Sequence, residues 1–335
     1  MSETSTLERP LHVGKVRLRN RVFLAPMSGV TDMPFRQRAW RHGAGMVVSE
    51  MVASAELVRG RAESVRRLEG ADGPQVVQLA GREAHWLAEA ARIAAGQGAD
   101  IIDINMGCPA KKVTGGYCGS ALMREPDHAV RLIEAVVAAV DVPVTVKMRL
   151  GWDDSAQNAP ELAARAAGAG VGMVTVHGRT RCQFYTGVAD WAAIRRVRDA
   201  IKVPLVVNGD IGSLHDAEAA LAASGADAVM VGRAHYGAPW LAGAIAGAPN
   251  QQPATPQTAF EYVVAHYDDM LALYGREKGL RHARKHLGWY LDRLAPEVDT
   301  ALRTTIMTAV EPAAVIAALR LAFLSDGSVA LERAA

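Results

Sequence analysis

The sequence predicts an α/β protein, a (β/α)8 TIM barrel followed by a C-terminal all-helical domain. Short apolar, β-branched runs occur eight times within about 245 residues, and most are followed by Ala-rich helical stretches, which is the size and rhythm of this barrel. The alternation then stops, and residues 257–324 show only amphipathic helical periodicity. These observations place the barrel first and the helical domain second.

A doubly wound parallel sheet is the structural alternative to the barrel. That fold would be supported by a Gly-x-Gly-x-x-Gly turn between a strand and a helix. The nearest match, Gly168-Ala169-Gly170-Val171-Gly172, precedes a predicted strand instead. The pattern therefore favours the barrel.

The predicted strands cover residues 22–26, 46–51, 75–79, 101–105, 144–148, 173–177, 205–208 and 228–232. Turn signals precede several of them, Gly-Ala-Asp at 98–100 and 225–227 and Val-Pro at 142–143 and 203–204. Helical patterns between the strands cover residues 83–95, 128–140, 160–167, 191–200 and 215–223.

A segment rich in Pro, Ala and Gln, residues 247–256, has the composition of a linker. We therefore place a catalytic barrel domain at residues 1–247, a linker at 248–256 and a helical domain at 257–335.

Composition excludes several classes of protein. Of the 335 residues, 50% are hydrophobic and 21% charged, which is typical of a soluble globular protein. The N-terminus lacks a secretion signal, and no apolar run reaches the roughly 18 residues of a membrane span. The three cysteines, Cys108, Cys118 and Cys182, form no Cys-x-x-Cys pair. We expect a cytoplasmic protein with no membrane association and no bound metal.

The segment Ile104-Asn105-Met106-Gly107-Cys108-Pro109 follows the apolar run 99–103 and is the strongest indication of chemistry in the chain. A buried strand ends here in a Gly-Cys-Pro turn, in which glycine supplies backbone freedom and proline fixes φ. A lone cysteine is usually a small core residue. This one lies just past a strand end, where α/β proteins carry their active sites, so a functional thiol is predicted.

Polar side chains recur at the other predicted strand ends. They are Gln78, Asn105, Cys108, Lys147, Arg149, His177, Asn208, Asp210 and Arg233. Because strand side chains repeat their direction every second residue, Asp103 and Asn105 share a face, and so do Lys147 and Arg149. Burying such groups is costly unless a polar ligand satisfies them. The alternative is a solvated barrel rim, which would not require so many polar groups together.

Two glycine turns specify the ligand further. Asn208-Gly209-Asp210-Ile211-Gly212 follows the seventh predicted strand, and Gly232-Arg233 follows the eighth. Glycines let backbone N–H groups approach an anion, an arginine can bind it with two donors, and this is the usual phosphate site of the fold. Simple tight turns are the alternative for either segment alone. With amide and cationic groups around the mouth, the set suits a phosphorylated planar cofactor, and FMN fits.

The chain resembles the tRNA-dihydrouridine synthases, most closely their bacterial B-type subfamily. The resemblance covers nearly the whole chain. It is carried, in the family's order, by APMSGVTD (25–32), INMGCPAKKV (104–113), GSALM (119–123), VKMRLGW (146–152), HGRTRCQFYTGVADW (177–191), VNGDI (207–211) and VGRA (231–234). Gly-Cys-Pro combined with His-Gly-Arg-Thr is the specific part.

The resemblance implies the roles of the site residues. Cys108 would be the catalytic general acid, Lys147 would stabilise the reduced flavin, and His177 would lie beside it. The FMN-binding set would be Ala25, Pro26, Met27, Gln78, Asn105, Lys147, His177, Asn208, Gly209, Asp210, Gly232 and Arg233. We assign Cys118 no role.

The implied reaction reduces uridine in the tRNA D-loop to 5,6-dihydrouridine. FMN N5 would give a hydride to uracil C6, Cys108 would give a proton to C5, and NADPH would reduce the flavin. A thiol with an ordinary pKa of about 8.5 is mostly protonated at neutral pH and can serve as an acid without tuning. A nucleophilic cysteine would instead need a lowered pKa.

The RNA partner would be held by basic side chains, and the target base must leave its stack to reach a barrel mouth. The predicted RNA-binding residues are Lys111, Lys112, Arg179, Arg181, Arg281, Arg284 and Lys285. A solvated helix face is the alternative for the charged run 276–286, since residues 254–335 contain 9 Lys and Arg against 10 Asp and Glu. We expect a monomer that binds one tRNA; the sequence does not identify the D-loop uridine.

Two other functions stay open from the sequence. A flavin-dependent oxidoreductase acting on a free pyrimidine would explain the barrel and the cysteine loop, but not the helical domain. A non-catalytic RNA-binding protein on a flavin barrel would leave Cys108, Lys147 and His177 without a role. Reoxidation of the flavin by a free pyrimidine rather than by tRNA would favour the first.

Overall fold

The computed structural model describes residues 6–70, 72–110, 118–249 and 252–324. The chain divides into two compact units, one of residues 1–234 and 240–249 and one of residues 235–239 and 250–335. Each unit is described separately below.

The first unit is built on a curled parallel sheet with the order β4-β3-β11-β10-β9-β8-β7-β6-β5. The strands are β3 (Val22–Leu24), β4 (Met46–Val47), β5 (Val52–Ala53), β6 (Val76–Ala80), β7 (Ile101–Met106), β8 (Val144–Arg149), β9 (Met173–His177), β10 (Leu205–Asn208) and β11 (Ala228–Val231). β4 and β5 are two parts of one barrel strand. Between them Val48 bridges Val76 of β6, which closes the sheet, so the predicted TIM barrel is confirmed.

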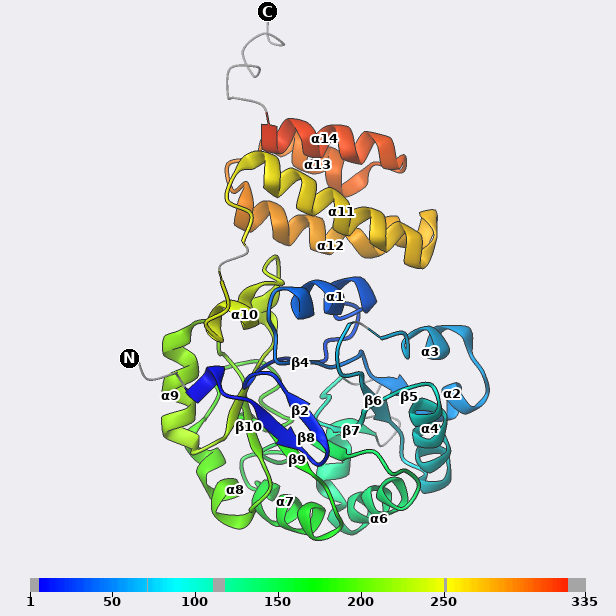
Figure 1. The fold of residues 1–335 in the computed structure, drawn as a ribbon, viewed down its shortest axis with the longest axis vertical. Coiled ribbons are helices and arrows are strands. Elements are labelled where there is room, and N and C mark those ends of the chain that lie inside the picture. Colours follow the sequence, from blue (N-terminus) through cyan, green and yellow to red (C-terminus); the bar gives the residue numbers. More distant parts are fainter. Residues whose placement is uncertain (1–5, 71, 111–117, 250–251, 325–335) are drawn as a thin grey trace, which may run out of the picture. The chain divides into compact units, whose positions relative to one another are not determined.

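Helices surround the strands, as Figure 1 shows. They are α1 (Met33–Arg41), α2 (Ser54–Val58), α3 (Ala62–Arg66), α4 (Ala84–Gly96), α6 (Pro126–Val137), α7 (Ala159–Gly168), α8 (Arg195–Ala200), α9 (Leu214–Ser224) and α10 (Leu241–Ile245), with 3-10 turns η2 (Gly119–Arg124), η3 (Ala192–Ile194) and η4 (Arg233–His235). The predicted helix at 191–200 is instead the 3-10 turn η3 followed by α8.

No sequence pattern predicts an element before residue 22, and the structure holds an antiparallel hairpin there, β1 (Leu11–Val13) and β2 (Val16–Leu18). Gly14 makes its turn at φ +55°, a conformation that favours glycine. Leu11, Val13 and Leu18 pack into one apolar cluster with residues of the barrel interior near the strand N-termini, such as Ile101. The hairpin thereby fills the end of the barrel opposite the polar strand ends, and its short strands explain why the sequence pattern missed it.

The strand register brings the polar side chains together. Across β7 and β8 Asn105 pairs with Lys147, and across β8 and β9 Arg149 pairs with His177. Asn208 of β10 pairs with the same His177. Residues directly opposite on parallel strands point to the same face, so these side chains share the interior of the barrel.

The second unit contains α11 (Pro256–Tyr274), α12 (Arg276–Leu294), α13 (Thr300–Thr308) and α14 (Pro312–Leu324), which confirms the predicted helical C-terminal part. Thr255 caps α11, since its side chain accepts from the N–H of Thr258 and Pro256 occupies the first turn. Within this unit the ring of Tyr236 stacks on Trp289 at a centroid distance of 4.0 Å. The segment 235–239 therefore belongs with these helices.

Within the part of the chain that the structure describes, none of the helices combines the length and the hydrophobicity that a membrane span requires. Within the same residues, no three side chains of His, Cys, Asp or Glu are arranged to hold a metal ion.

Candidate active site

A buried row of hydrogen bonds leads from the barrel interior to the cysteine loop. Thr145 Oγ1 donates to Asp103 Oδ1 at 2.6 Å, and Gln78 Nε2 donates to Asp103 Oδ2 at 2.7 Å. Asn105 Nδ2 donates to Gln78 Oε1 at 2.8 Å. Burial raises the pKa of Asp103, while the hydrogen bonds from Thr145 and Gln78 and the charge of Lys147 oppose the rise.

The other end of this row of hydrogen bonds lies at the loop that carries Cys108. Asn105 Oδ1 accepts the N–H groups of Gly107 and Cys108 at 3.1 and 3.0 Å. Backbone N–H groups only donate, so Asn105 Oδ1 is the acceptor; its Nδ2 then donates to Gln78 Oε1, and Gln78 Nε2 donates to Asp103, which fixes the orientations of both amides. Ser120 also donates to the Cys108 carbonyl from its N–H at 3.1 Å and its hydroxyl at 2.9 Å. The backbone of the half-buried Cys108 is thus held firmly.

Lys147 is one of the buried cations of the site. Its Nζ donates to Asn208 Oδ1 at 2.9 Å, while Asn208 Nδ2 donates to the Met230 carbonyl at 2.8 Å. Burial, together with the nearby charge of Arg149, lowers the pKa of Lys147 to about 8. The ammonium form therefore still predominates at neutral pH, but the proton is held weakly.

This pKa can be measured directly. We expect competitive acylation of the cofactor-free protein to give a half-point for Lys147 near pH 8, against 10.5 for an ordinary lysine. The folded protein binds this proton more weakly than the unfolded chain, so the Lys147 contribution to stability rises with pH between these values. A half-point near 10.5 would show that burial does not act on this amine.

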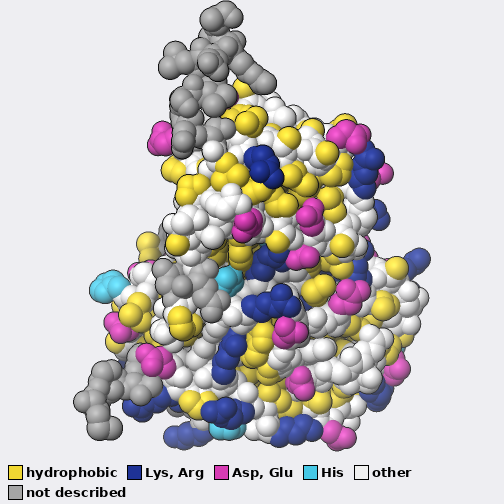
Figure 2. All heavy atoms as spheres, turned by 45° about the horizontal axis from the view of Figure 1, so that its top comes forward, with side chains coloured by type: hydrophobic (Ala, Val, Ile, Leu, Met, Phe, Trp, Pro, Cys, Tyr) yellow, Lys and Arg dark blue, Asp and Glu magenta, His cyan; other side chains and the backbone are white. Residues whose placement is uncertain are grey.

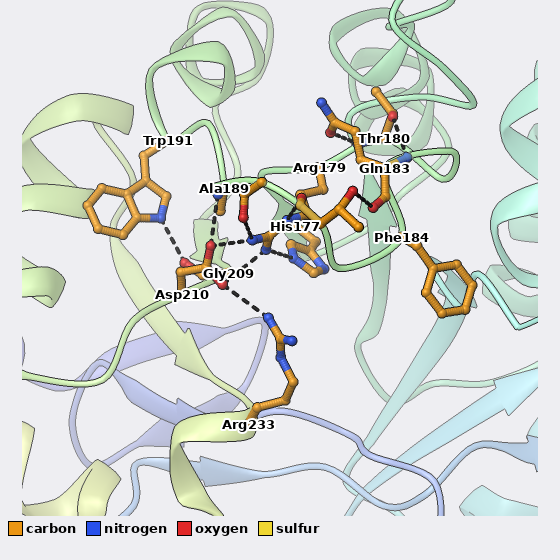
Figure 3. A network of polar contacts seen from close by, with 12 residues as sticks. His177, Arg179, Thr180, Gln183, Phe184, Ala189, Trp191, Gly209, Asp210 and Arg233 are labelled. Atoms are coloured by element: carbon orange, nitrogen blue, oxygen red, sulfur yellow. Dashed lines mark hydrogen bonds and ion pairs between the residues drawn. The ribbon is translucent and has the colours of Figure 1, made fainter.

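His177 stands beside a bidentate ion pair, drawn in Figure 3. Arg179 Nη1 and Nη2 donate to Asp210 Oδ1 and Oδ2 at 3.0 and 2.5 Å, and Arg233 Nη2 donates to Oδ1 at 3.2 Å. Arg179 Nη1 also lies 3.3 Å from His177 Nε2. Since arginine only donates, Nε2 is the acceptor and the proton of the neutral ring lies on Nδ1.

The charges of this cluster set two further pKa values. The pKa of His177 is lowered well below its usual range by burial and by the positive charges of Lys147, Arg149, Arg179 and Arg233. For Asp210, burial raises the pKa, but the hydrogen bonds from Arg179 and the Ala189 N–H and the charges of Arg179 and Arg233 outweigh it, and the pKa falls. At neutral pH the imidazole is uncharged and the carboxylate is ionised.

Gly209 makes this arrangement possible. Its φ is +118°, and a Cβ there would come within 2.7 Å of the Ala189 Cβ and 2.8 Å of the His177 ring. Asp210 follows in the left-handed region at φ +53°, which is uncommon for a residue other than glycine. The predicted Asn-Gly-Asp segment is therefore a strained turn that directs its carboxylate at Arg179.

The structure corrects the role predicted for Arg179. Its exposed fraction is 1%, and its remaining donors bind the carbonyls of Thr186 and Gly187 at 3.0 and 2.7 Å. A buried guanidinium whose donors are all used cannot reach an RNA phosphate. Arg179 instead ties the loop after β9 to Asp210.

The other predicted RNA-binding residues differ in their surroundings. Lys111 and Lys112 lie outside the described residues. Arg181 is half-buried, with its guanidinium 4.8 Å from the Trp152 ring centre. In the second unit Arg281 is exposed and pairs with Glu277 at 3.5 Å, whereas the half-buried Arg284 donates to the Thr308 carbonyl at 3.2 Å.

Lys285 of the same helix is half-buried. On the face shown in Figure 2, basic and acidic side chains are interspersed.

The loop after β3 carries the predicted contacts Ala25, Pro26 and Met27 and is fixed by residues that the sequence did not single out. The Ala25 N–H donates to the Val231 carbonyl at 2.9 Å, which joins β3 to the end of β11. The buried Glu50 carboxylate accepts the Gly29 N–H. Glu50 follows β4 inside the barrel, so only the closed barrel reveals this contact.

Arg233 and Tyr185 line the open side of the site. The Arg233 side chain is 46% exposed and stacks over the Tyr185 ring at 4.7 Å, so part of its guanidinium faces solvent and can bind an anion. Tyr185 is 44% exposed, and its ring centre lies 6.3 Å from that of His177. Tyr185 lies within the segment 177–191 but was not among the predicted site residues.

Known proteins resemble this chain along most of its length. A family model described as dihydrouridine synthase matches residues 23–326. A "Probable tRNA-dihydrouridine synthase" of Rhizobium leguminosarum bv. phaseoli is 62% identical over 90% of this chain and 95% of that protein. The "tRNA-dihydrouridine synthase B" of Xanthomonas campestris pv. campestris is 44% identical over 92% of this chain and 95% of that protein.

Among solved structures, morphinone reductase superposes with a TM-score of 0.53 at 17% identity, over 77% of this chain and 94% of that chain. A 2-naphthoyl-CoA reductase complex gives a TM-score of 0.58 at 14% identity, over 73% of this chain and 52% of that chain. At these identities the likeness supports the barrel fold alone.

Proposed function

The chain belongs to the dihydrouridine synthase family, and from this premise we propose that it reduces uridine in tRNA to 5,6-dihydrouridine with FMN as cofactor and NADPH as reductant. One observation carries the proposal: the Cys108 loop, Lys147 and His177 converge at the carboxyl ends of adjacent strands. A thiol, a cation and a neutral imidazole in one barrel mouth suit the reduction of a polarised double bond.

The donors present fit FMN. Lys147 Nζ donates one hydrogen bond to Asn208, and the partly exposed Arg233 donates one to Asp210. Each side chain therefore has further N–H groups that can donate to a ligand. Together Arg179, Arg233 and Asp210 carry two positive charges against one negative charge, which favours a phosphate beside Arg233. Gln78, Asn105 and Asn208 would surround the ring system with amides.

FMN, when bound, would supply the hydride that uracil C6 accepts. We assign Cys108 the proton for C5, which its thiol gives up while the C5–C6 double bond becomes single; solvent then reprotonates the thiolate. Lys147 would hold positive charge where negative charge develops. The uncharged His177 would donate a hydrogen bond from Nδ1 without transferring its proton.

The substrate base would have to leave its stack to reach these groups. The exposed ring of Tyr185, beside His177 and Arg233, offers a face against which an unstacked base can lie. We assign tRNA contacts outside the mouth to Arg181, Arg281, Arg284, Lys285 and the two lysines at 111 and 112. The helical unit is then the tRNA-binding domain, and a monomer in the cytoplasm would suffice.

One experiment separates this proposal from the free-pyrimidine alternative. The FMN-loaded protein is reduced anaerobically with NADPH, and unmodified tRNA or free uracil is then added while flavin absorbance is followed. We expect fast reoxidation by tRNA with dihydrouridine in the product, and none by uracil. Reoxidation by the free pyrimidine alone would contradict a tRNA substrate.

A further inference from the structure

Arg149 connects two loops of the active site through one buried guanidinium. Its Nε donates to the Gly107 carbonyl at 2.9 Å, in the loop that carries Cys108. Its Nη1 donates to the carbonyls of Thr180 and Phe184, each at 2.8 Å, in the loop after β9. The side chain is 1% exposed, so these carbonyls replace water as its partners.

The loop after β9 is strained at the point that Arg149 holds. Phe184 has φ +55°, a genuine outlier for a bulky residue, and the residue as a whole is 40% exposed. Such a conformation persists only where its surroundings fix it, and the bond from Arg149 to the Phe184 carbonyl is one such constraint. The next residue, Tyr185, has its ring 5.4 Å from the Arg149 guanidinium.

The two loops contribute different groups to the proposed reaction. The first carries the proton donor, and the second presents Tyr185 and contains Arg179, which contacts His177. Because a planar guanidinium holds its donors at fixed angles, Arg149 sets the distance between Gly107 and Phe184 more rigidly than a lysine could.

We propose that Arg149 is a positioning residue, which fixes the spacing between the Cys108 loop and the Phe184–Tyr185 loop and thereby places the thiol for proton transfer without touching the substrate. The proposal rests on the function assigned above for the role of Cys108. The coupling of the two loops does not depend on that function and can be tested separately.

The first test measures the two half-reactions of Arg149→Met, Arg149→Lys and a matched surface control, Arg92→Met, whose arginine is exposed and pairs with Glu89. In Arg149→Met we expect reoxidation by tRNA to slow by about 10- to 100-fold, since small misplacements of a reacting group have effects of this size. The rate of flavin reduction by NADPH and the affinity for FMN should each change by less than about twofold, because neither depends on the placement of the Cys108 thiol. Arg149→Lys should be intermediate, and the control unchanged.

Chemical rescue adds a readout that general damage to the fold would not give. Guanidinium chloride should restore part of the tRNA reaction of Arg149→Ala, and ammonium chloride at the same concentration should not. Equal salt is needed because RNA binding weakens as salt rises. Rescue by neither cation would contradict the proposal.

Hydrogen exchange tests the coupling without any activity. In Arg149→Met the backbone amides of residues 105–110 and 180–186 should exchange faster together, while α4 stays protected. Faster exchange in only one segment, in neither, or throughout the barrel would overturn the proposal, as would equal slowing of both half-reactions. If wild-type protein is not reoxidised by tRNA, the assigned function fails instead, and the exchange result still decides the coupling.

Discussion

Cys108→Ala should bind FMN and be reduced by NADPH at the wild-type rate, yet lose about 10²- to 10⁴-fold of its reoxidation by tRNA, the usual contribution of a general acid. The reason is that the backbone of Cys108 is held by Asn105 and Ser120, not by its own thiol, so alanine should leave the loop in place. Anaerobic stopped-flow absorbance measures both half-reactions.

Cys118→Ala is the matched control for this variant. Cys118 is also half-buried, and burial raises the pKa of its thiol, but we assign it no role in the reaction. We expect both of its half-reactions to be unchanged. If Cys108→Ala kept full reoxidation by tRNA, or if Cys118→Ala lost it equally, Cys108 would not be the acid.

Asp210→Ala should lower the free energy of unfolding of the cofactor-free protein by about 3 kcal/mol, because it leaves the guanidinium of Arg179 buried without its carboxylate. We take the lower end of the usual range because the Asp210 side chain is itself 27% exposed. For a unit of this size the melting temperature should fall by roughly 6–12 °C. Thermal melts followed by circular dichroism measure the change.

The pH dependence of Asp210→Asn has a definite sign. The pKa of Asp210 is lowered in the folded state, so its stabilisation is present above the unfolded value of about 3.9 and is lost as pH falls through the folded value. The difference in free energy of unfolding between wild type and Asp210→Asn should therefore be constant from pH 5 to 8 and should disappear in acid. Glu56→Gln, which breaks only exposed ion pairs, should cost no more than about 1 kcal/mol. An equal loss in both variants would show that burial of Arg179 is not the cause.

Much of the site was predictable because it follows from strand periodicity. Asn105, Lys147, His177 and Asn208 end buried strands, and alternate residues of a strand face the same side. Once the strands were placed, these residues had to meet at the barrel mouth, as the register confirms. The roles of these residues toward FMN and tRNA stay predictions.

Arg179 shows where that reasoning fails. Its sequence neighbours are polar, and nothing local distinguishes an exposed cation from a buried one. Its partner Asp210 is 31 residues away, and their contact depends on a turn after the next strand. Glu50, which holds Gly29, and Arg149, which joins two loops, are likewise defined by distant backbone groups.

Hydrophobic periodicity was enough to predict the closed barrel, the helical C-terminal unit and the set of strand-end residues, because it is a local property of the chain. The folded chain was needed to show which charges are buried, which partners they take, and that a short hairpin fills the far end of the barrel. Those outcomes depend on contacts between residues far apart in the chain, where the cost of burying a charge or a backbone group selects the partner.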